Sequence, residues 1–306
     1  MTRSDSFLPL LVLFSVFGAQ PVLACATGCT VFDVSTSGVL PGKPGSVVWV
    51  EHNYVNQTHN YSGDSHAPDV DNDHKKIRSN SYTAGGQYMF DRAWGIRATA
   101  PVIDRNNVSI DDDTGDEASN SHIGLGDVRV QGIYSGLSPD MSTGLTFGLK
   151  LPTGDTDDIG FDRDSAIGTG STDLLLGFYH IGNFHDVPYG WFINGQWAQP
   201  LLTRGDYRPG SEVNVSTGVY YKGWNVGKVK ITPVMQINGV QHFRDSGAES
   251  HREDSGYTQF LASPGVEFNF GSMKLYTDIS TPVYQYIYGN QLIAPVTVKT
   301  VLSYNF

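Results

Sequence analysis

From Gly45 onward, the sequence is built of runs of ten to fifteen residues in which apolar side chains recur at every second position. In one such run, residues 141–152, one face carries Met141, Thr143, Leu145, Phe147, Leu149 and Leu151, and the other carries glycine, hydroxyl side chains and Lys150. A period of two is that of a β-strand with one apolar face. An amphipathic helix would space apolar residues three and four apart, and none of these runs does so. The chain is therefore predicted to be all-β.

The same pattern predicts twelve strands, joined by connections that are alternately long and short. The expected strands cover residues 46–57, 80–90, 92–103, 122–134, 141–152, 171–182, 188–200, 211–222, 228–243, 257–269, 273–285 and 292–306. The connections 58–79, 104–121, 153–170, 201–210, 244–256 and 286–291 are mostly long, whereas 91–92, 135–140, 183–187, 223–227 and 270–272 are short. Long and short connections therefore fall at opposite ends of the strands.

Strands of about ten residues with short turns at one end and longer loops at the other are typical of outer-membrane barrels. A sheet that faces lipid must close on itself, because edge N–H and C=O groups find no partner in hydrocarbon. We therefore predict, over residues 46–306, one transmembrane antiparallel up-and-down β-barrel of the bacterial outer-membrane type. It should contain about twelve strands, with ten to fourteen allowed, and both termini should lie in the periplasm.

The N-terminus reads as an export signal. A short start with Arg3 precedes an apolar run from Phe7 to Ala19, and small residues allow cleavage after Ala24 or Ala26. This run is too short for a membrane-spanning helix, which needs roughly 20 residues. We predict a signal peptide over 1–26, a periplasmic segment over 27–45, and localisation in the outer membrane of a Gram-negative bacterium.

Cys25 and Cys29 are the two cysteines of the chain. Their spacing fits a disulfide, an unremarkable pair, or a lipid attachment site at Cys25, although Leu23 is a poor match to a lipoprotein cleavage box. Two thiolates supply only half of a tetrahedral metal site. These alternatives stay open at the level of the sequence, and a disulfide between Cys25 and Cys29 is one of them.

Aromatic side chains gather near the short-turn ends of the expected strands, where tyrosine and tryptophan favour the boundary between water and lipid. They include Tyr88, Phe90, Tyr134, Phe178, Tyr189, Trp191, Tyr221, Trp224, Phe268, Tyr304 and Phe306. The last strand places Tyr304 and the terminal Phe306 on its apolar face. This ending resembles the C-terminal signal read by the machinery that assembles outer-membrane barrels, so that machinery is an expected partner.

The faces turned away from lipid carry charged side chains, which the dry core of a soluble β-sandwich would have to pair completely. A barrel of about twelve strands leaves a narrow lumen, between the filled interior of eight strands and the channel of sixteen. The candidates for lining this lumen are Arg97, Asp127, Arg129, Lys150, Asp173, Lys230, Glu267 and Asp278. Each of them could instead belong to a ladder of ion pairs that braces neighbouring strands.

Acidic residues concentrate in the long loops, which hold 20 of the 31 acids in a chain of net charge -11. The acidic balance argues against nucleic acid as a partner. The loops are either simply solvated, or they bind divalent cations weakly, with Asp111, Asp112, Asp113 and Asp116 as the candidate ligands. Such cations could bridge loops or neighbouring lipopolysaccharide.

Motifs for catalysis and cofactors fail on inspection. Asp69, Asp71 and Asp73 begin like a calcium loop, but His74 stands where the turn glycine belongs. The glycine pairs of the chain lack the third glycine and the helix of a dinucleotide site. The stretch Gly63-Asp64-Ser65-His66 hints at an esterase or phospholipase, yet no convincing base is found among His52, His122, His180 and His242. We expect no enzyme activity, no catalytic residue and no cofactor.

Four stretches together resemble a known family: GLGDVRVQGIY (124–134), GLKLPTGD (148–155), IGTGSTDLLLGFY (167–179) and PVYQYIYGNQL (282–292). They look like the outer-membrane transporter-like β-barrels of the MetA-pathway of phenol degradation family, over residues 122–306. The resemblance implies a barrel that helps small organic molecules cross the outer membrane, and it implies no catalytic residue. The segment with Cys25 and Cys29 and the first two acidic loops depart from the family pattern.

The expected function is a channel or transporter that passes small solutes by passive diffusion, with aromatic or other organic solutes implied by the resemblance. The loop from Thr153 to Gly170 and the lumen charges should set its selectivity. The alternative is a non-conducting surface barrel whose acidic loops bind cations or a partner, and an esterase or phospholipase is a third. Lipid, lipopolysaccharide and a small-molecule solute are the remaining expected partners.

Overall fold

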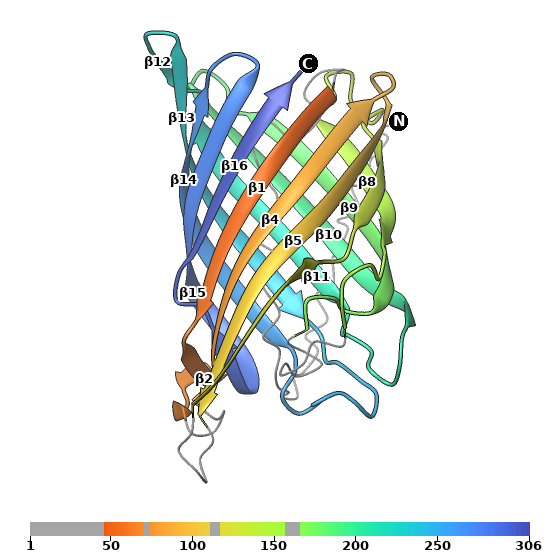
Figure 1. The fold of residues 1–306 in the computed structure, drawn as a ribbon. Coiled ribbons are helices and arrows are strands. Elements are labelled where there is room, and N and C mark those ends of the chain that lie inside the picture. The colour runs from red at the N-terminus through yellow and green to blue at the C-terminus, as the bar shows by residue number, and fades with distance from the viewer. Residues whose placement is uncertain (1–45, 70–73, 111–116, 157–165) are drawn as a thin grey trace, which may run out of the picture.

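The computed structural model describes residues 46–69, 74–110, 117–156 and 166–306, and these form a closed antiparallel barrel (Figure 1). The strands are β1 (Ser46–Gln57), β2 (His59–Gly63), β3 (Ser65–His66), β4 (Lys76–Met89), β5 (Trp94–Ile110), β6 (Glu117–Leu125), β7 (Arg129–Tyr134), β8 (Thr143–Lys150), β9 (Ser171–Asn183), β10 (Tyr189–Thr203), β11 (Glu212–Tyr221), β12 (Trp224–Val226), β13 (Val229–His242), β14 (Tyr257–Asn269), β15 (Met273–Ile293) and β16 (Thr297–Asn305). In these four ranges no helix is both long and apolar enough to span a bilayer. The predicted signal peptide, the 27–45 segment, Cys25 and Cys29 lie outside them.

The ring closes where β1 pairs with β16, from Val47 opposite Asn305 to Val55 opposite Thr297. Strands β6 and β7 both pair with β5 and together make one barrel strand, so twelve strands form the wall in the described part of the chain. This confirms the predicted twelve-stranded antiparallel barrel. The start of β1 and the end of β16 lie at the end of the barrel that carries the short turns, which we call the short-turn end, opposite the long-loop end (Figure 1).

The last strand differs from the prediction. Residues 292 and 293 belong to β15, which continues past the barrel wall and pairs with β2, and β16 begins only at Thr297. Leu292 and Ala294 are each 5% exposed and therefore do not share the outward face of Leu302 and Tyr304. The expectation of one apolar face from residue 292 to 306 is therefore wrong for residues 292–296. The apolar alternation continues through the connection between β15 and β16, so the sequence pattern does not show where one strand ends and the next begins.

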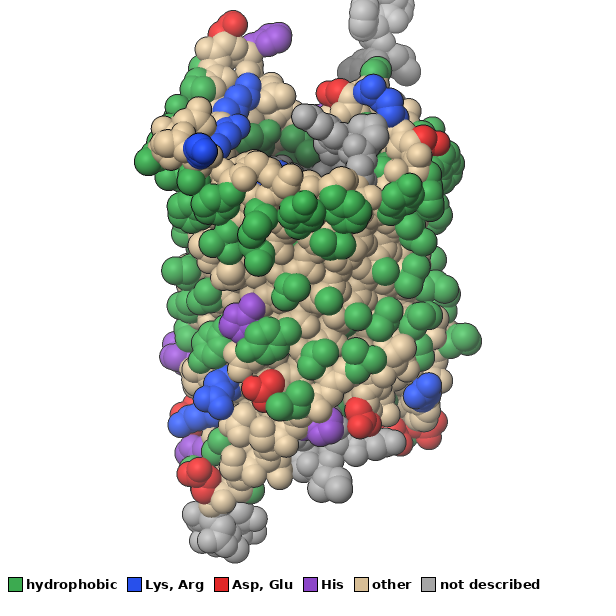
Figure 2. Space-filling view, turned by 45° about the horizontal axis from the view of Figure 1, so that its top comes forward, with side chains coloured by type: hydrophobic (Ala, Val, Ile, Leu, Met, Phe, Trp, Pro, Cys, Tyr) green, Lys and Arg blue, Asp and Glu red, His purple; other side chains and the backbone are tan. Residues whose placement is uncertain are grey.

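The outer wall is apolar, and charged side chains gather toward the two ends (Figure 2). Leu145, Phe147 and Leu149 are 44%, 44% and 40% exposed on β8, as the period of two predicts. Met141 is the exception, since it is 1% exposed and packs with Met89, Ile133 and Tyr179. It lies in the turn before β8 with a φ of 61°, in the left-handed region. The turn therefore carries Met141 inward, and the prediction that it faces lipid is wrong.

A ring of exposed aromatic side chains surrounds the short-turn end on the outside. Its members include Tyr88, Phe90, Tyr189, Trp224, Tyr304 and Phe306, each at least 47% exposed. Neighbouring rings touch, as between Tyr88 and Phe90 and between Tyr189 and Tyr221. Amphipathic rings at this level suit the boundary between the membrane and water.

Inside the wall, large side chains lie over glycines of the neighbouring strand. Trp49 on β1 faces Gly85 on β4, and a Cβ on Gly85 would lie 2.2 Å from the indole ring. The next residue, Gly86, points outward, where a Cβ would lie 3.8 Å from its nearest neighbour, Val48.

We therefore expect Gly85→Ala to lower the free energy of unfolding by about 1–3 kcal/mol, because an overpacked site must shift its neighbours. Gly86→Ala is the matched control and should change stability by less than about 0.5 kcal/mol. Urea unfolding of the refolded barrel, followed by tryptophan fluorescence, measures both. Equal stabilities of the two variants would contradict the close fit of Trp49 on β4.

Candidate solute cavity in the barrel lumen

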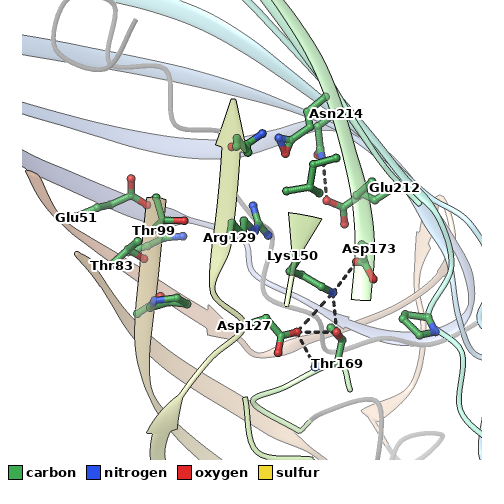
Figure 3. Close-up of a pocket in the computed structure, with 18 of the residues that line it drawn as sticks. Glu51, Thr83, Thr99, Asp127, Arg129, Lys150, Thr169, Asp173, Glu212 and Asn214 are labelled. Carbon is green, nitrogen blue, oxygen red and sulfur yellow. Dashed lines mark hydrogen bonds and ion pairs between the residues drawn. The ribbon is translucent and has the colours of Figure 1, made fainter. Parts of the chain in front are cut away.

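A cavity of about 330 Å³ lies inside the barrel, in the half nearer the long loops (Figure 3). Its walls come from β1, β4, β5, β7, β8, β9, β10 and β11, and His242 of β13 also contributes. Residues 166–169 and 207–210 of two long loops cover it at the long-loop end. Trp49, Ile133 and Tyr179 limit it toward the short-turn end. The inward positions of consecutive strands thus build one space lined by both polar and apolar side chains.

A buried ion cluster stands at the edge of this cavity. Lys150 Nζ lies 2.6 Å from Asp173 Oδ2 and 3.5 Å from Asp127 Oδ2, and it also donates a hydrogen bond of 2.6 Å to Thr169 Oγ1. Asp127 in turn accepts hydrogen bonds from the Thr169 hydroxyl and from the backbone N–H groups of Thr169 and Gly154. The cluster therefore holds both described ends of the connection between β8 and β9 at the barrel mouth.

Strand register explains why these charges meet. Lys150 on β8 sits opposite Arg129 on β7 and opposite Asp173 on β9. Like charges placed directly opposite each other are unfavourable, and carboxylates on both sides of Lys150 compensate for its neighbour Arg129. The side chains of Lys150, Asp127 and Asp173 are 8% exposed or less.

A second cluster joins two other long loops. His242 at the end of β13 faces Glu212 at the start of β11, with 3.4 Å between Nδ1 and Oε2, an ion-pair distance without hydrogen-bond geometry. Its Nε2 lies 3.2 Å from Asp245 Oδ1. Asp245 also accepts hydrogen bonds from the Tyr207 hydroxyl at 2.9 Å and the Gly210 N–H at 2.7 Å. The loop after β10 is thereby tied to the loop after β13.

The lumen beside β11 and β13–β16 is filled by side chains, and we call this region the packed half. Lys299 and Asp278 lie 3.7 Å apart, and Gln236 donates to the Tyr276 hydroxyl at 3.2 Å. The packed half comprises Ser216, Thr232, Val234, Gln236, Asn238, Ser263, Glu267, Tyr276, Asp278, Ser280, Lys299 and Val301, all 7% exposed or less. An apolar cluster of Val47, Trp49, Phe192, Val234, Tyr276 and Val301 adjoins it. The cavity of about 330 Å³ therefore lies on the opposite side of the lumen.

The eight predicted lumen residues divide between these regions. Arg97, Asp127, Arg129, Lys150 and Asp173 line the cavity, and Arg97 donates to Gln87 Oε1 with its guanidinium 6.0 Å from the centre of the Trp49 ring. Glu267 and Asp278 are buried in the packed half, 3% and 2% exposed. Lys230 is exposed near the short-turn end of β13. The structure thus brings five of the eight together and separates the other three from them.

Other predicted residues stand apart from the cavity. Asp111, Asp112, Asp113 and Asp116 lie outside the described residues, and within the described ranges no group of three His, Cys, Asp or Glu residues is arranged to hold a metal ion. Tyr304 and Phe306 stack on the outer wall with ring centres 6.1 Å apart. The Ser65 hydroxyl donates to Asp64 Oδ1 at 2.9 Å, and His66 contacts Tyr61.

Sequence reasoning missed the cluster of Glu212, His242 and Asp245. The sequence pattern presents His242 only as a candidate base for Ser65, and Asp245 only as one of many loop acids. The usable signal was the spacing of three residues between His242 and Asp245 at a strand end. Glu212 could not be added, because its pairing with His242 depends on the register between β11 and β13.

The fold is that of the bacterial outer-membrane β-barrels. Among solved structures, an outer membrane channel from Pseudomonas putida F1 aligns with a TM-score of 0.67 and 12% identity, covering 90% of this chain and 100% of that one. The beta domain of the Bordetella autotransporter BrkA aligns with a TM-score of 0.51 and 12% identity, covering 86% and 100% of the two chains. No family model and no curated protein matches the sequence. The fold is thereby shown, and the resemblance to the phenol-degradation family stays a prediction.

Proposed function

We propose that this protein is an outer-membrane channel through which small solutes diffuse passively. The observation that carries the proposal is the cavity of about 330 Å³, lined by charged and polar side chains, inside a closed barrel with an apolar outer wall. A barrel of this kind suits a bilayer on its outside and a hydrated solute on its inside. The shared fold with an outer membrane channel agrees with this reading.

The route of the solute follows from the division of the lumen. The cavity approaches the long loops, and the end of the barrel with the short turns is hollowed as well (Figure 2). Because side chains fill the packed half, the solute would pass along β1 to β10 and cross the level of Trp49, Arg97 and Tyr179. We assign selectivity to the cavity charges and to the connection from Thr153 to Gly170.

The proposal also assigns the partners expected from the sequence. The apolar wall and its aromatic ring would contact outer-membrane lipid and lipopolysaccharide, and Tyr304 and Phe306 would serve the assembly machinery. The family resemblance adds aromatic or other organic molecules as candidate solutes.

Planar-bilayer recording of the purified, refolded protein tests the proposal. We expect small, reproducible and solute-dependent currents. Thr99→Trp, which adds bulk at a residue lining the cavity, should reduce the conductance severalfold, whereas Ala98→Trp on the outer wall should leave it unchanged. A correctly folded barrel that stays silent would refute the proposal and favour a non-conducting surface barrel whose loops bind cations or a partner.

A further inference from the structure

Nearly all charged side chains around the cavity already have a hydrogen-bond or ion-pair partner within the protein. Lys150 has both Asp127 and Asp173 beside it. Glu212 accepts a hydrogen bond of 2.5 Å from Asn214 and faces His242. The carboxylates that line the cavity are Glu51, Asp127, Asp173 and Glu212, and each already has an interaction partner. A cationic solute would therefore have to displace an existing contact.

The cations show one exception. Arg97 donates to Gln87, and Arg105 donates to the Ser79 hydroxyl at 3.1 Å and to the Ala166 carbonyl at 3.1 Å. Arg129 lines the same cavity, and in the described part of the chain no hydrogen bond or ion pair joins its side chain to a neighbour. Figure 3 shows Arg129 between Thr99 and Glu51 on one side and Lys150 and Glu212 on the other.

We propose that Arg129 binds the carboxylate of a small organic anion, and that the cavity around it is the solute-binding site. The inference rests on the proposed function and names the class of solute. A guanidinium stays charged at all accessible pH values and offers a planar fork of N–H donors that matches a carboxylate with two parallel hydrogen bonds. Glu212 is an electrostatic neighbour of Arg129, but among the described residues the guanidinium has no hydrogen-bonded carboxylate, and an anionic solute would supply one.

The rest of the cavity favours a compact solute with an apolar body. Asn194, 7% exposed, has a buried side-chain nitrogen without a hydrogen-bond partner, which offers a second donor. The apolar lining includes Val55, Pro101, Ile103, Ile133, Ile167 and Leu175. Ligand cavities usually measure about 300–1,000 Å³, so a volume of about 330 Å³ limits the solute to small molecules. The site therefore fits a monocarboxylate with a body the size of one ring.

Calorimetric titration of the folded barrel in detergent tests the proposal with three probes of similar shape: benzoate, benzyl alcohol and benzylamine. We expect benzoate to bind at least about tenfold more tightly than the neutral or the cationic probe. Arg129→Gln should weaken benzoate binding by about tenfold or more and leave benzyl alcohol unchanged. Arg129→Lys keeps the positive charge but lacks the planar fork of N–H donors, so its affinity for benzoate should lie between those of the wild type and Arg129→Gln. Lys228→Gln removes one exposed positive charge at the short-turn end and should match the wild type.

Equal binding of benzoate and benzyl alcohol to the wild type would overturn the assignment, and so would unchanged benzoate binding in Arg129→Gln. The comparison of probes on the wild type decides the question even if Arg129→Gln does not fold. Bilayer recording separates the two proposals. Benzoate binding through Arg129 in a silent barrel would refute the channel and keep the site, whereas currents without preference for benzoate would keep the channel and refute the site.

Discussion

Replacing Lys150 by methionine is expected to lower the free energy of unfolding by about 3–5 kcal/mol. The substitution leaves Asp127 and Asp173 buried without their shared cation, 3.5 Å and 2.6 Å from where the ammonium stood. Uncompensated buried charge is costly, because little water reaches the site to screen it. The hydrogen bonds that Asp127 accepts from Gly154 and Thr169 should also weaken, so the described ends of the connection between β8 and β9 should separate.

Urea unfolding in lipid vesicles, followed by tryptophan fluorescence, measures the loss. The triple variant Lys150→Met, Asp127→Asn and Asp173→Asn removes the carboxylate charges together with their partner and should recover much of the stability. Lys228→Met, at an exposed turn, is the matched control and should be nearly neutral. A loss of less than about 1 kcal/mol in the single variant would show that water reaches the cluster and that it is not a buried ion cluster.

A positive charge should destabilise the barrel much more on the outer face of a strand than on its inner face. Val130, 37% exposed on the outer wall, is followed by Gln131, which lines the cavity. Val130→Arg is expected to destabilise the barrel by about 2–4 kcal/mol, because it places a guanidinium in the hydrocarbon region. Gln131→Arg adds the same charge toward the lumen, where it borders the cavity but lies opposite Arg97, and should cost less than Val130→Arg.

The same unfolding assay compares the two variants, and bilayer recording gives an independent readout. Gln131→Arg should alter ion selectivity because it adds a second cation next to Arg129, whereas folded Val130→Arg should keep the selectivity of the wild type. If Gln131→Arg were the more damaging substitution, the assignment of the two faces, and with it the proposed membrane embedding, would be refuted.

The fold was predictable because each strand carries its own signal. The expected strand 46–57 coincides with β1, and 257–269 coincides with β14, since apolar alternation and flanking polar residues mark their limits. The ends of strands that extend beyond the barrel wall are harder to predict from the sequence. Residues 286–293 continue β15 through pairing with β2, which is a long-range contact that no local pattern encodes. Met141 was misplaced because a left-handed turn residue interrupts the period of two.

The cavity was predictable only in outline. The sequence places Arg97, Arg129 and Lys150 on inward faces, because alternation decides the face. Which cation acquires a carboxylate depends on the register between strands and on loop contacts. Lys150 receives Asp173 from β9 and Asp127 from the loop before β7, while Arg129, directly opposite on β7, receives neither. Asp278 and Glu267 occupy inward strand positions as Asp173 does, but long-range packing places them in the packed half and not at the cavity.

The packed half has a mechanical consequence. The seam between β16 and β1, where the barrel closes, borders the packed half. Its two strands are supported from inside by the buried side chains of Lys299, Asp278 and Trp49. The arc of β5 to β9 borders the cavity along much of its length instead. Thermal fluctuations of the wall should therefore be largest in that arc. The rate at which a solute crosses the lumen would depend on how often the arc widens. The internally packed seam between β16 and β1 would keep the barrel closed.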